Sequence, residues 1–136
     1  MTTPLELLIR VGLGKKASEA RIALRELPAS DVMPAVLEAV ADARPKVRSA
    51  GYSFGASTPE LCALFPFDRL IGGATDPDAG VRLSVVLALN VGFGPKNELV
   101  YQSRSKQLKP VFTRLQADSD KRVATQAAVV AKRYGL

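Results

Sequence analysis

The stretch Asp76–Leu89 reads DPDAGVRLSVVLAL and decides how the chain folds. It begins as a tight turn, in which Asp76 or Asp78 can accept the free N–H groups of a helix start and Pro77 occupies a position that needs no N–H. The helix that follows, expected over about 78–91, has almost no polar face. Because a helix that is apolar nearly all round must be buried on several sides, we expect this one to lie at the centre of the molecule.

The composition favours a single all-α domain over residues 1–136. Apolar residues make up 47% of the chain and charged residues 24%, which is ordinary for a globular domain, and there is no tryptophan. No apolar run reaches the roughly 20 residues that cross a bilayer. The N-terminus lacks the features of a secretion signal, and the single cysteine, Cys62, excludes an internal disulfide. We therefore expect a cytoplasmic protein.

Apolar spacing and turn residues predict a succession of helices and no strand of useful length. Residues 96–106 are polar and basic, and we interpret them as a helical insertion or an ordered loop. The expected helices span about 4–12, 17–27, 31–41, 45–54, 60–64, 67–71, 78–91, 108–117 and 120–134.

Three parts of the chain share one register. In each, an aspartate at a turn is followed five residues later by a valine, and in the first two copies an arginine comes next. The copies are Asp42/Val47/Arg48, Asp76/Val81/Arg82 and Asp118/Val123. They begin 34 and then 42 residues apart, and another helix precedes each one. A period of this length with two helices per unit indicates an α-solenoid.

In this register the chain resembles HEAT-like repeats, including the short bacterial kind, over about residues 15–136. In that family the second helix of each pair typically opens with Asp-x-x-x-x-Val-Arg followed by small residues. The resemblance implies a right-handed α-α superhelix, a short α-solenoid of about three helix pairs. It identifies an architecture and no activity. The aspartates are expected to cap helices and to pair with an arginine from the next unit.

Residues suited to catalysis or metal binding are scarce. There is no histidine, which removes the commonest general base and a main zinc ligand. The Asp-x-Asp pairs at 76–78 and 118–120 lack the further ligands of a calcium loop. Ser103 and Lys106 form a Ser-x-x-Lys pair without the other motifs of the enzymes that use one. Cys62 has apolar neighbours and is expected to be a buried thiol. We predict no catalytic residue, cofactor or metal, and no enzyme activity.

The net charge of +6 is carried by the last third of the chain. Residues 1–95 hold ten basic and ten acidic side chains, whereas residues 96–136 hold nine basic and three acidic ones. A solvated face with cations near helix C-termini would explain this excess, and so would a surface for an anionic partner. The candidate residues for such a partner are Lys96, Arg104, Lys106, Lys109, Arg114, Lys132 and Arg133.

Three functions follow from these patterns. The first is a scaffold or adaptor that binds another protein or itself through a concave face or the last helix, since solenoids present extended recognition surfaces. The alternative is nucleic-acid binding, because HEAT-like alkylpurine DNA glycosylases, which the repeats resemble, hold duplex DNA on a basic concave face. Those enzymes rely on tryptophans that this chain lacks, so base excision is not expected. An accessory role like that of the HEAT-like bilin lyases ranks third. No membrane partner is expected.

The last helix supports the first of these functions. One of its faces is apolar and either packs inward or offers a docking surface, with Ala124 and Ala128 extending the apolar area. The residues of this face are Val123, Ala127, Val130, Ala131 and Tyr134.

Overall fold

The computed structural model describes residues 2–92 and 104–136, and all regular structure in these two ranges is helical, which confirms the all-α class. The helices are α1 (Pro4–Leu13), α2 (Ala17–Arg25), α3 (Ala29–Ala39), α4 (Pro45–Gly55), α5 (Pro59–Leu64), α6 (Phe67–Gly72), the 3₁₀ turn η1 (Gly73–Thr75), α7 (Ala79–Gly92), α9 (Ser105–Gln116) and α10 (Lys121–Tyr134). No helix in the described ranges is long and apolar enough to cross a membrane.

Local chemistry fixes the ends of α1. Thr3 and Glu6 form a capping box: the Thr3 hydroxyl accepts the Glu6 N–H at 3.2 Å, and the Glu6 carboxylate accepts the Thr3 N–H at 3.1 Å. At the other end Gly14 has φ of 70°, a left-handed conformation that a glycine adopts without strain. The chain can therefore turn at once into α2.

The start of α9 differs from the expectation. The helix begins at Ser105, earlier than the predicted 108, and Pro110 lies inside it. Lys106 is therefore helical, and the part of the 96–106 prediction that concerns residues 96–103 lies outside the described residues. Proline removes only one backbone hydrogen bond, and Leu108 and Phe112 on either side of it are fully buried. Burial of Leu108 and Phe112 therefore stabilises a helix that continues past Pro110 in spite of the lost hydrogen bond.

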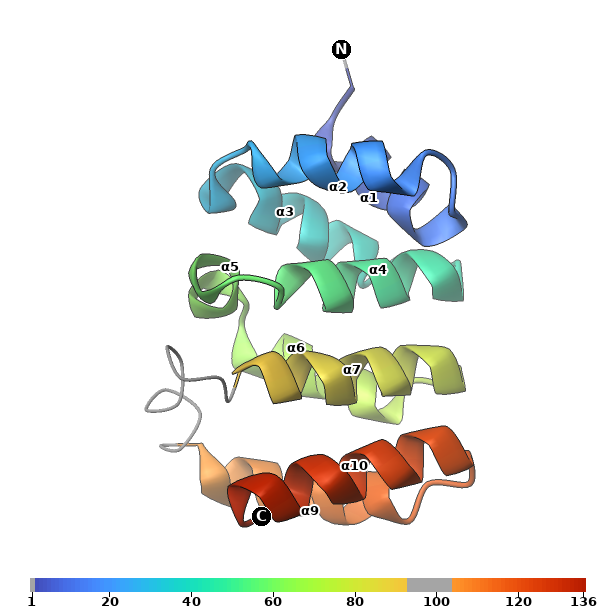
Figure 1. Cartoon of the computed structure of the whole chain (residues 1–136), viewed down its shortest axis with the longest axis vertical. Coiled ribbons are helices and arrows are strands. Elements are labelled where there is room, and N and C mark those ends of the chain that lie inside the picture. Colours follow the sequence, from blue (N-terminus) through green and yellow to red (C-terminus); the bar gives the residue numbers. More distant parts are fainter. Residues whose placement is uncertain (1, 93–103) are drawn as a thin grey trace.

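The helices lie in successive layers along the long axis of the molecule (Figure 1). In this view α4, α7 and α10 lie one below the other, with α3, α6 and α9 behind them. Contacts follow the same order: α4 packs on α7 and α7 on α10, while α3 packs on α4 and α9 on α10. At the N-terminal end, α1 packs on α2, α3 and α4. Helix α7 is thus enclosed between two neighbours.

The three valines of the sequence repeat form the middle of the core. Val47, Val81 and Val123 are each the third residue of their helices, α4, α7 and α10, and each is completely buried. Close approach of the α1 backbone helps to bury Val47. A Cβ added to Gly12 of α1 would lie 2.6 Å from the Lys46 carbonyl oxygen, so these two helices meet at a distance that only glycine permits.

Helix α7 is less buried than its sequence predicts. Val81, Val85, Val86 and Leu89 are fully buried, as expected for a central helix. On its remaining side, however, Leu87 is 45% exposed and Val91 44%. The expectation of burial on several sides is confirmed for the sides of α7 that face α4 and α10. It fails on the third side, because no described residue covers these two side chains.

Candidate binding face

Two ion pairs tie consecutive helices together. The Nε and Nη2 groups of Arg48 on α4 donate to the Asp76 carboxylate at 2.9 and 3.0 Å. In the same way, Arg82 on α7 donates to Asp118 at 2.7 and 3.0 Å. Such two-pronged pairing fixes both distance and orientation. The first aspartate of the repeat, Asp42, pairs instead with Arg44, its own neighbour.

Each of the two arginines also holds the turn that precedes its own helix. Arg82 Nη1 donates to the backbone carbonyls of Asp76 and Pro77 at 2.8 and 3.2 Å. Arg48 Nη1 does the same with the carbonyls of Asp42 and Ala43, both at 3.0 Å. One guanidinium therefore joins two turns, and the repeat register is built into the contacts between units.

The direction of this pairing corrects the sequence-based expectation. The arginine comes from the preceding unit and not from the next one, since Arg82 reaches forward to Asp118. The third copy therefore needs no arginine after Val123 to receive an ion pair. Asp118 is the last acceptor, and Arg82 already serves it.

The repeat aspartates Asp76 and Asp118 shape turns instead of capping the helices that follow, contrary to the expectation for them. Asp76 and Asp118 accept the N–H two residues ahead, at 2.9 Å in both cases, which is a turn-forming contact. The helix starts are capped by the next aspartates: Asp78 accepts the Val81 N–H, and Asp120 is the N-cap of α10. Of the two capping candidates in the opening stretch, Asp78 is thus the cap of α7.

Hydrogen bonds set the charge states of these carboxyls. The side-chain hydrogen bond from Arg82 lowers the pKa of Asp118, outweighing the opposing effect of burial. For Asp76, burial acts to raise the pKa, but the hydrogen bonds from Arg48 and from the Asp78 N–H lower it overall. In turn, the hydrogen bonds to these aspartates raise the pKa of Arg48 and Arg82. All four groups are charged at neutral pH.

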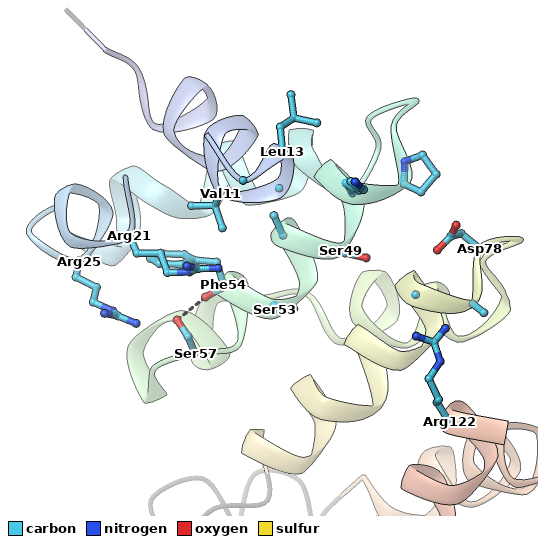
Figure 2. Close-up of a pocket in the computed structure, with 17 residues that line it drawn as sticks. Val11, Leu13, Arg21, Arg25, Ser49, Ser53, Phe54, Ser57, Asp78 and Arg122 are labelled. Carbon is cyan, nitrogen blue, oxygen red and sulfur yellow. Dashed lines mark hydrogen bonds between the residues drawn. The ribbon is translucent and has the colours of Figure 1, made fainter. Parts of the chain in front are cut away.

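A groove of about 760 Å³ crosses the molecule beside these turns (Figure 2). Its walls come from the end of α1, from α2 and α4, and from the starts of α7 and α10. Its apolar floor includes Val11, Ala50 and Phe54, and its polar lining consists mainly of serines and cations. The polar and charged lining residues are Arg21, Arg25, Lys46, Ser49, Ser53, Ser57, Asp78 and Arg122.

The groove has a marked excess of positive charge. Arg21 and Arg25 lie at one end of it in Figure 2, with Asp78 and Arg122 toward the other. Of the lining residues that the structure describes, Asp78 is the one acidic side chain, and its carboxylate already caps α7. Within the described part of the chain, neither Arg21 nor Arg25 forms an ion pair. The groove is therefore suited to an anionic ligand.

A second hollow, of about 490 Å³, lies between α7 and α10 and is mostly apolar. Leu83 and Leu87 form one side, and Thr125 and Gln126 form the other, with Lys121 and Arg122 at its end. One turn farther along each helix stand Val91 and Val129, the latter 56% exposed. We call Leu83, Leu87, Val91 and Val129 the apolar strip.

The predicted face of the last helix packs inward. Val123, Ala127, Val130 and Ala131 are all buried, and Tyr134 is half-buried. The large apolar side chain that α10 exposes is Val129, which the predicted face did not include, whereas Ala128, which was expected to extend the apolar area, is also exposed. At about 100° per residue, Val129 lies nearly opposite the centre of the buried face, which is why the predicted apolar face did not contain it.

Most of the predicted anion-binding cations lie away from the groove. Lys106, Lys109 and Arg114 are exposed on α9, and Lys132 and Arg133 are exposed at the end of α10. Arg104 lies over the Phe67 ring at 4.6 Å and so joins the start of α9 to that of α6. Lys96 lies outside the described residues.

The sequence did not predict Arg21 and Arg25 as binding residues, because the charge was summed over long segments of the chain. Residues 1–95 are neutral in total, yet Arg21 and Arg25 stand four apart and share one side of α2. Ser49 and Ser53 have the same spacing on α4. This four-residue spacing is the signal that was present in the sequence.

Other candidate chemistry is limited. Cys62 is buried, as expected, and its thiol donates to the Ala56 carbonyl oxygen at 3.3 Å. No three or more acidic or cysteine side chains gather into a metal-binding group within residues 2–92 and 104–136. No protein-family model, curated protein or solved structure matches this chain.

Proposed function

We propose that the chain is a short HEAT-like α-solenoid of about three helix pairs, with the right-handed superhelix of that class, and that it binds another protein. The recurring Asp-x-x-x-x-Val register and the arginine that links each turn to the next support the architecture. In this proposal the protein acts in the cytoplasm as a scaffold or adaptor and catalyses no reaction of its own.

The apolar strip is the observation that carries the binding function. Leu87, Val91 and Val129 are each more than two-fifths exposed, although most other apolar side chains of α7 and α10 are buried or half-buried. Leu87 also borders the hollow between α7 and α10. Exposed apolar side chains gathered along one groove are typical of protein interaction sites, and aliphatic anchors in a shallow pocket suit the side chains of a partner.

Replacing two residues of the strip tests this function. In the Leu87→Glu/Val129→Glu variant, new charges would occupy the centre of the interface. We expect a partner captured from cells by the wild-type protein to be lost, because burying an unpaired carboxylate is costly. The matched control is Leu64→Glu on α5, which is 46% exposed and far from the strip in sequence. Equal capture by all three proteins would refute the role of the strip.

Nucleic-acid binding is the second candidate function, and the exposed cations of α9 favour it. Lys106, Lys109 and Arg114 form no ion pair within the described residues. If they contact phosphates, affinity for duplex DNA should fall steeply as salt rises, because counterions are released on binding. A fluorescence titration at low and moderate salt measures this, and absence of binding at low salt would end the proposal.

A further inference from the structure

We propose that the groove between α2, α4 and α10 binds an acidic peptide segment in extended conformation, with carboxylates at alternate positions. This inference rests on the proposed protein-binding function. It adds to the apolar strip a second site, which would bind a protein partner through charged side chains. It concerns different residues from the apolar strip, so the two sites can be tested separately.

Charge complementarity selects an anion. Among the described residues, the lining has the cations Arg21, Arg25, Lys46 and Arg122 and one acid, Asp78, which is already engaged as a helix cap. Arg122 also has a partner, since its side chain donates to Asp120 at 3.3 Å. Arg21 and Arg25 are like charges four residues apart on one helix, which disfavour each other until an anion lies between or beside them.

Spacing selects an extended chain with alternating carboxylates. Four residues of α-helix rise by about 6 Å, which is the separation of Arg21 from Arg25 along α2. In an extended peptide, side chains two residues apart lie on the same side and about 6.6 Å apart. Two carboxylates in a Glu-x-Glu arrangement therefore match the two guanidinium groups, and each pair can be two-pronged.

The rest of the lining suits a peptide better than a nucleic acid. Ser49 and Ser53 offer hydroxyls that both donate and accept, which fits the N–H and C=O groups of a peptide backbone. Single-stranded nucleic acids need exposed aromatic rings for stacking. Phe54 is the one aromatic residue of the lining in the described part of the chain, and it is 6% exposed, so it serves as an apolar floor.

Fluorescence anisotropy with a designed probe tests the proposal. The probe is a fluorescein-labelled peptide with Glu at every second position and Ala or Val between, and the reference probe carries Gln in place of Glu. We expect the Glu probe to bind the full chain and the Gln probe to bind at least about tenfold more weakly, since charge-assisted hydrogen bonds are lost. Equal binding of both probes would overturn the proposal.

Paired charge variants distinguish the groove from general attraction. Arg21→Gln/Arg25→Gln removes two charges from the groove, and Lys109→Gln/Arg114→Gln removes two from α9, so that both variants have the same net charge. All four side chains are exposed, and circular dichroism checks that the folds are intact. We expect about a tenfold loss of Glu-probe affinity for the first variant and less than about threefold for the second. Equal losses would overturn the groove assignment.

Two further measurements separate this proposal from its alternatives. If duplex DNA displaces the Glu probe and its own binding is weakened by the groove variant, the groove is a nucleic-acid site and the peptide proposal fails. The Leu87→Glu/Val129→Glu variant should keep its affinity for the Glu probe. The two proposals can also fail separately. If Leu87→Glu/Val129→Glu loses the captured partner, but neither the wild-type protein nor any variant binds the Glu probe, the proposed function stands and the groove proposal is wrong.

Discussion

Arg82 makes four hydrogen bonds, two to a carboxylate of the following unit and two to carbonyls of its own turn. Side chains in a helix lean toward its N-terminus, which brings this guanidinium back over the turn that begins α7. Asp118, the carboxylate that it holds, has a side chain only 9% exposed. The ion pair therefore replaces water that Asp118 has largely lost.

We predict that Arg82→Met destabilises the fold by about 2 kcal/mol, since it leaves a shielded carboxylate without its donors. Urea unfolding measures the loss. The matched control is Arg122→Met, which removes an arginine whose side chain is 67% exposed beside Asp120. That exposed pair should contribute much less than the Arg82–Asp118 pair, because solvent screens it. A cost for Arg122→Met as large as that for Arg82→Met would contradict this account.

The same pair makes stability depend on pH. Because the pKa of Asp118 is lowered on folding from its ordinary 3.8, its contribution is complete above that value and is lost as pH falls through the lowered folded value. The direction is the same for Asp76. We expect the stability difference between wild type and Arg82→Met to be largest near about pH 7 and to shrink toward about pH 2. A difference that grows on acidification would refute the pairing.

At the scale of helices, adjacent glycines have opposite roles. A Cβ on Gly73 would lie 2.5 Å from Val85 Cγ2 and 2.6 Å from Tyr52 Cζ, so η1 fits between α4 and α7 only without a side chain. A Cβ on Gly72 would meet nothing within 4 Å. The two positions differ in packing and share nearly the same backbone conformation.

We predict that Gly73→Ala destabilises the protein by about 1–3 kcal/mol through overpacking. Gly72→Ala is the control and should be neutral or stabilising by up to about 1 kcal/mol, since alanine loses less backbone entropy on folding. Thermal and urea unfolding of both variants provide the measurement. If both substitutions were tolerated equally, the layer of α4, η1 and α7 would be looser than these distances indicate.

Helix positions were accessible from the sequence, whereas the exposed sides of helices were not. Periodic apolar residues and turn residues predicted α7 closely, because those signals are local. These signals could not reveal that Leu87 stays exposed. The residues of α7 are apolar on nearly every side of the helix, so the sequence does not distinguish the side that remains exposed. Exposure of Leu87 depends on which neighbours reach it, and that is a property of the packed helices.

At the scale of the whole molecule, the groove illustrates the same limit. It joins side chains from α1, α2, α4, α7 and α10, which no single stretch of sequence brings together. By contrast, the repeat register predicted that Asp76 and Asp118 stand at equivalent turns, because recurring units must make recurring contacts. The sequence could not assign the direction of pairing, since an arginine between two turns has a carboxylate on either side.

Because the helices pack in successive layers, we expect the two ends of the molecule to be energetically separable. The strongest packing of α10 is with α9 and α7, whereas α1 packs on α2, α3 and α4. In a stack of units joined only to their neighbours, a terminal unit can open while the rest remains folded. A single cooperative core would instead transmit any loss to all helices.

We therefore predict that Val123→Ala, which removes two buried methyl groups, weakens protection against amide hydrogen exchange in α9 and α10 by about 2 kcal/mol. Protection in α1 to α4 should change much less. Leu8→Ala at the opposite end provides the matched control, because Leu8 is also fully buried, and it should weaken α1 and α2 while sparing α10. Uniform loss of protection in both variants would show one indivisible core, which would count against a solenoid.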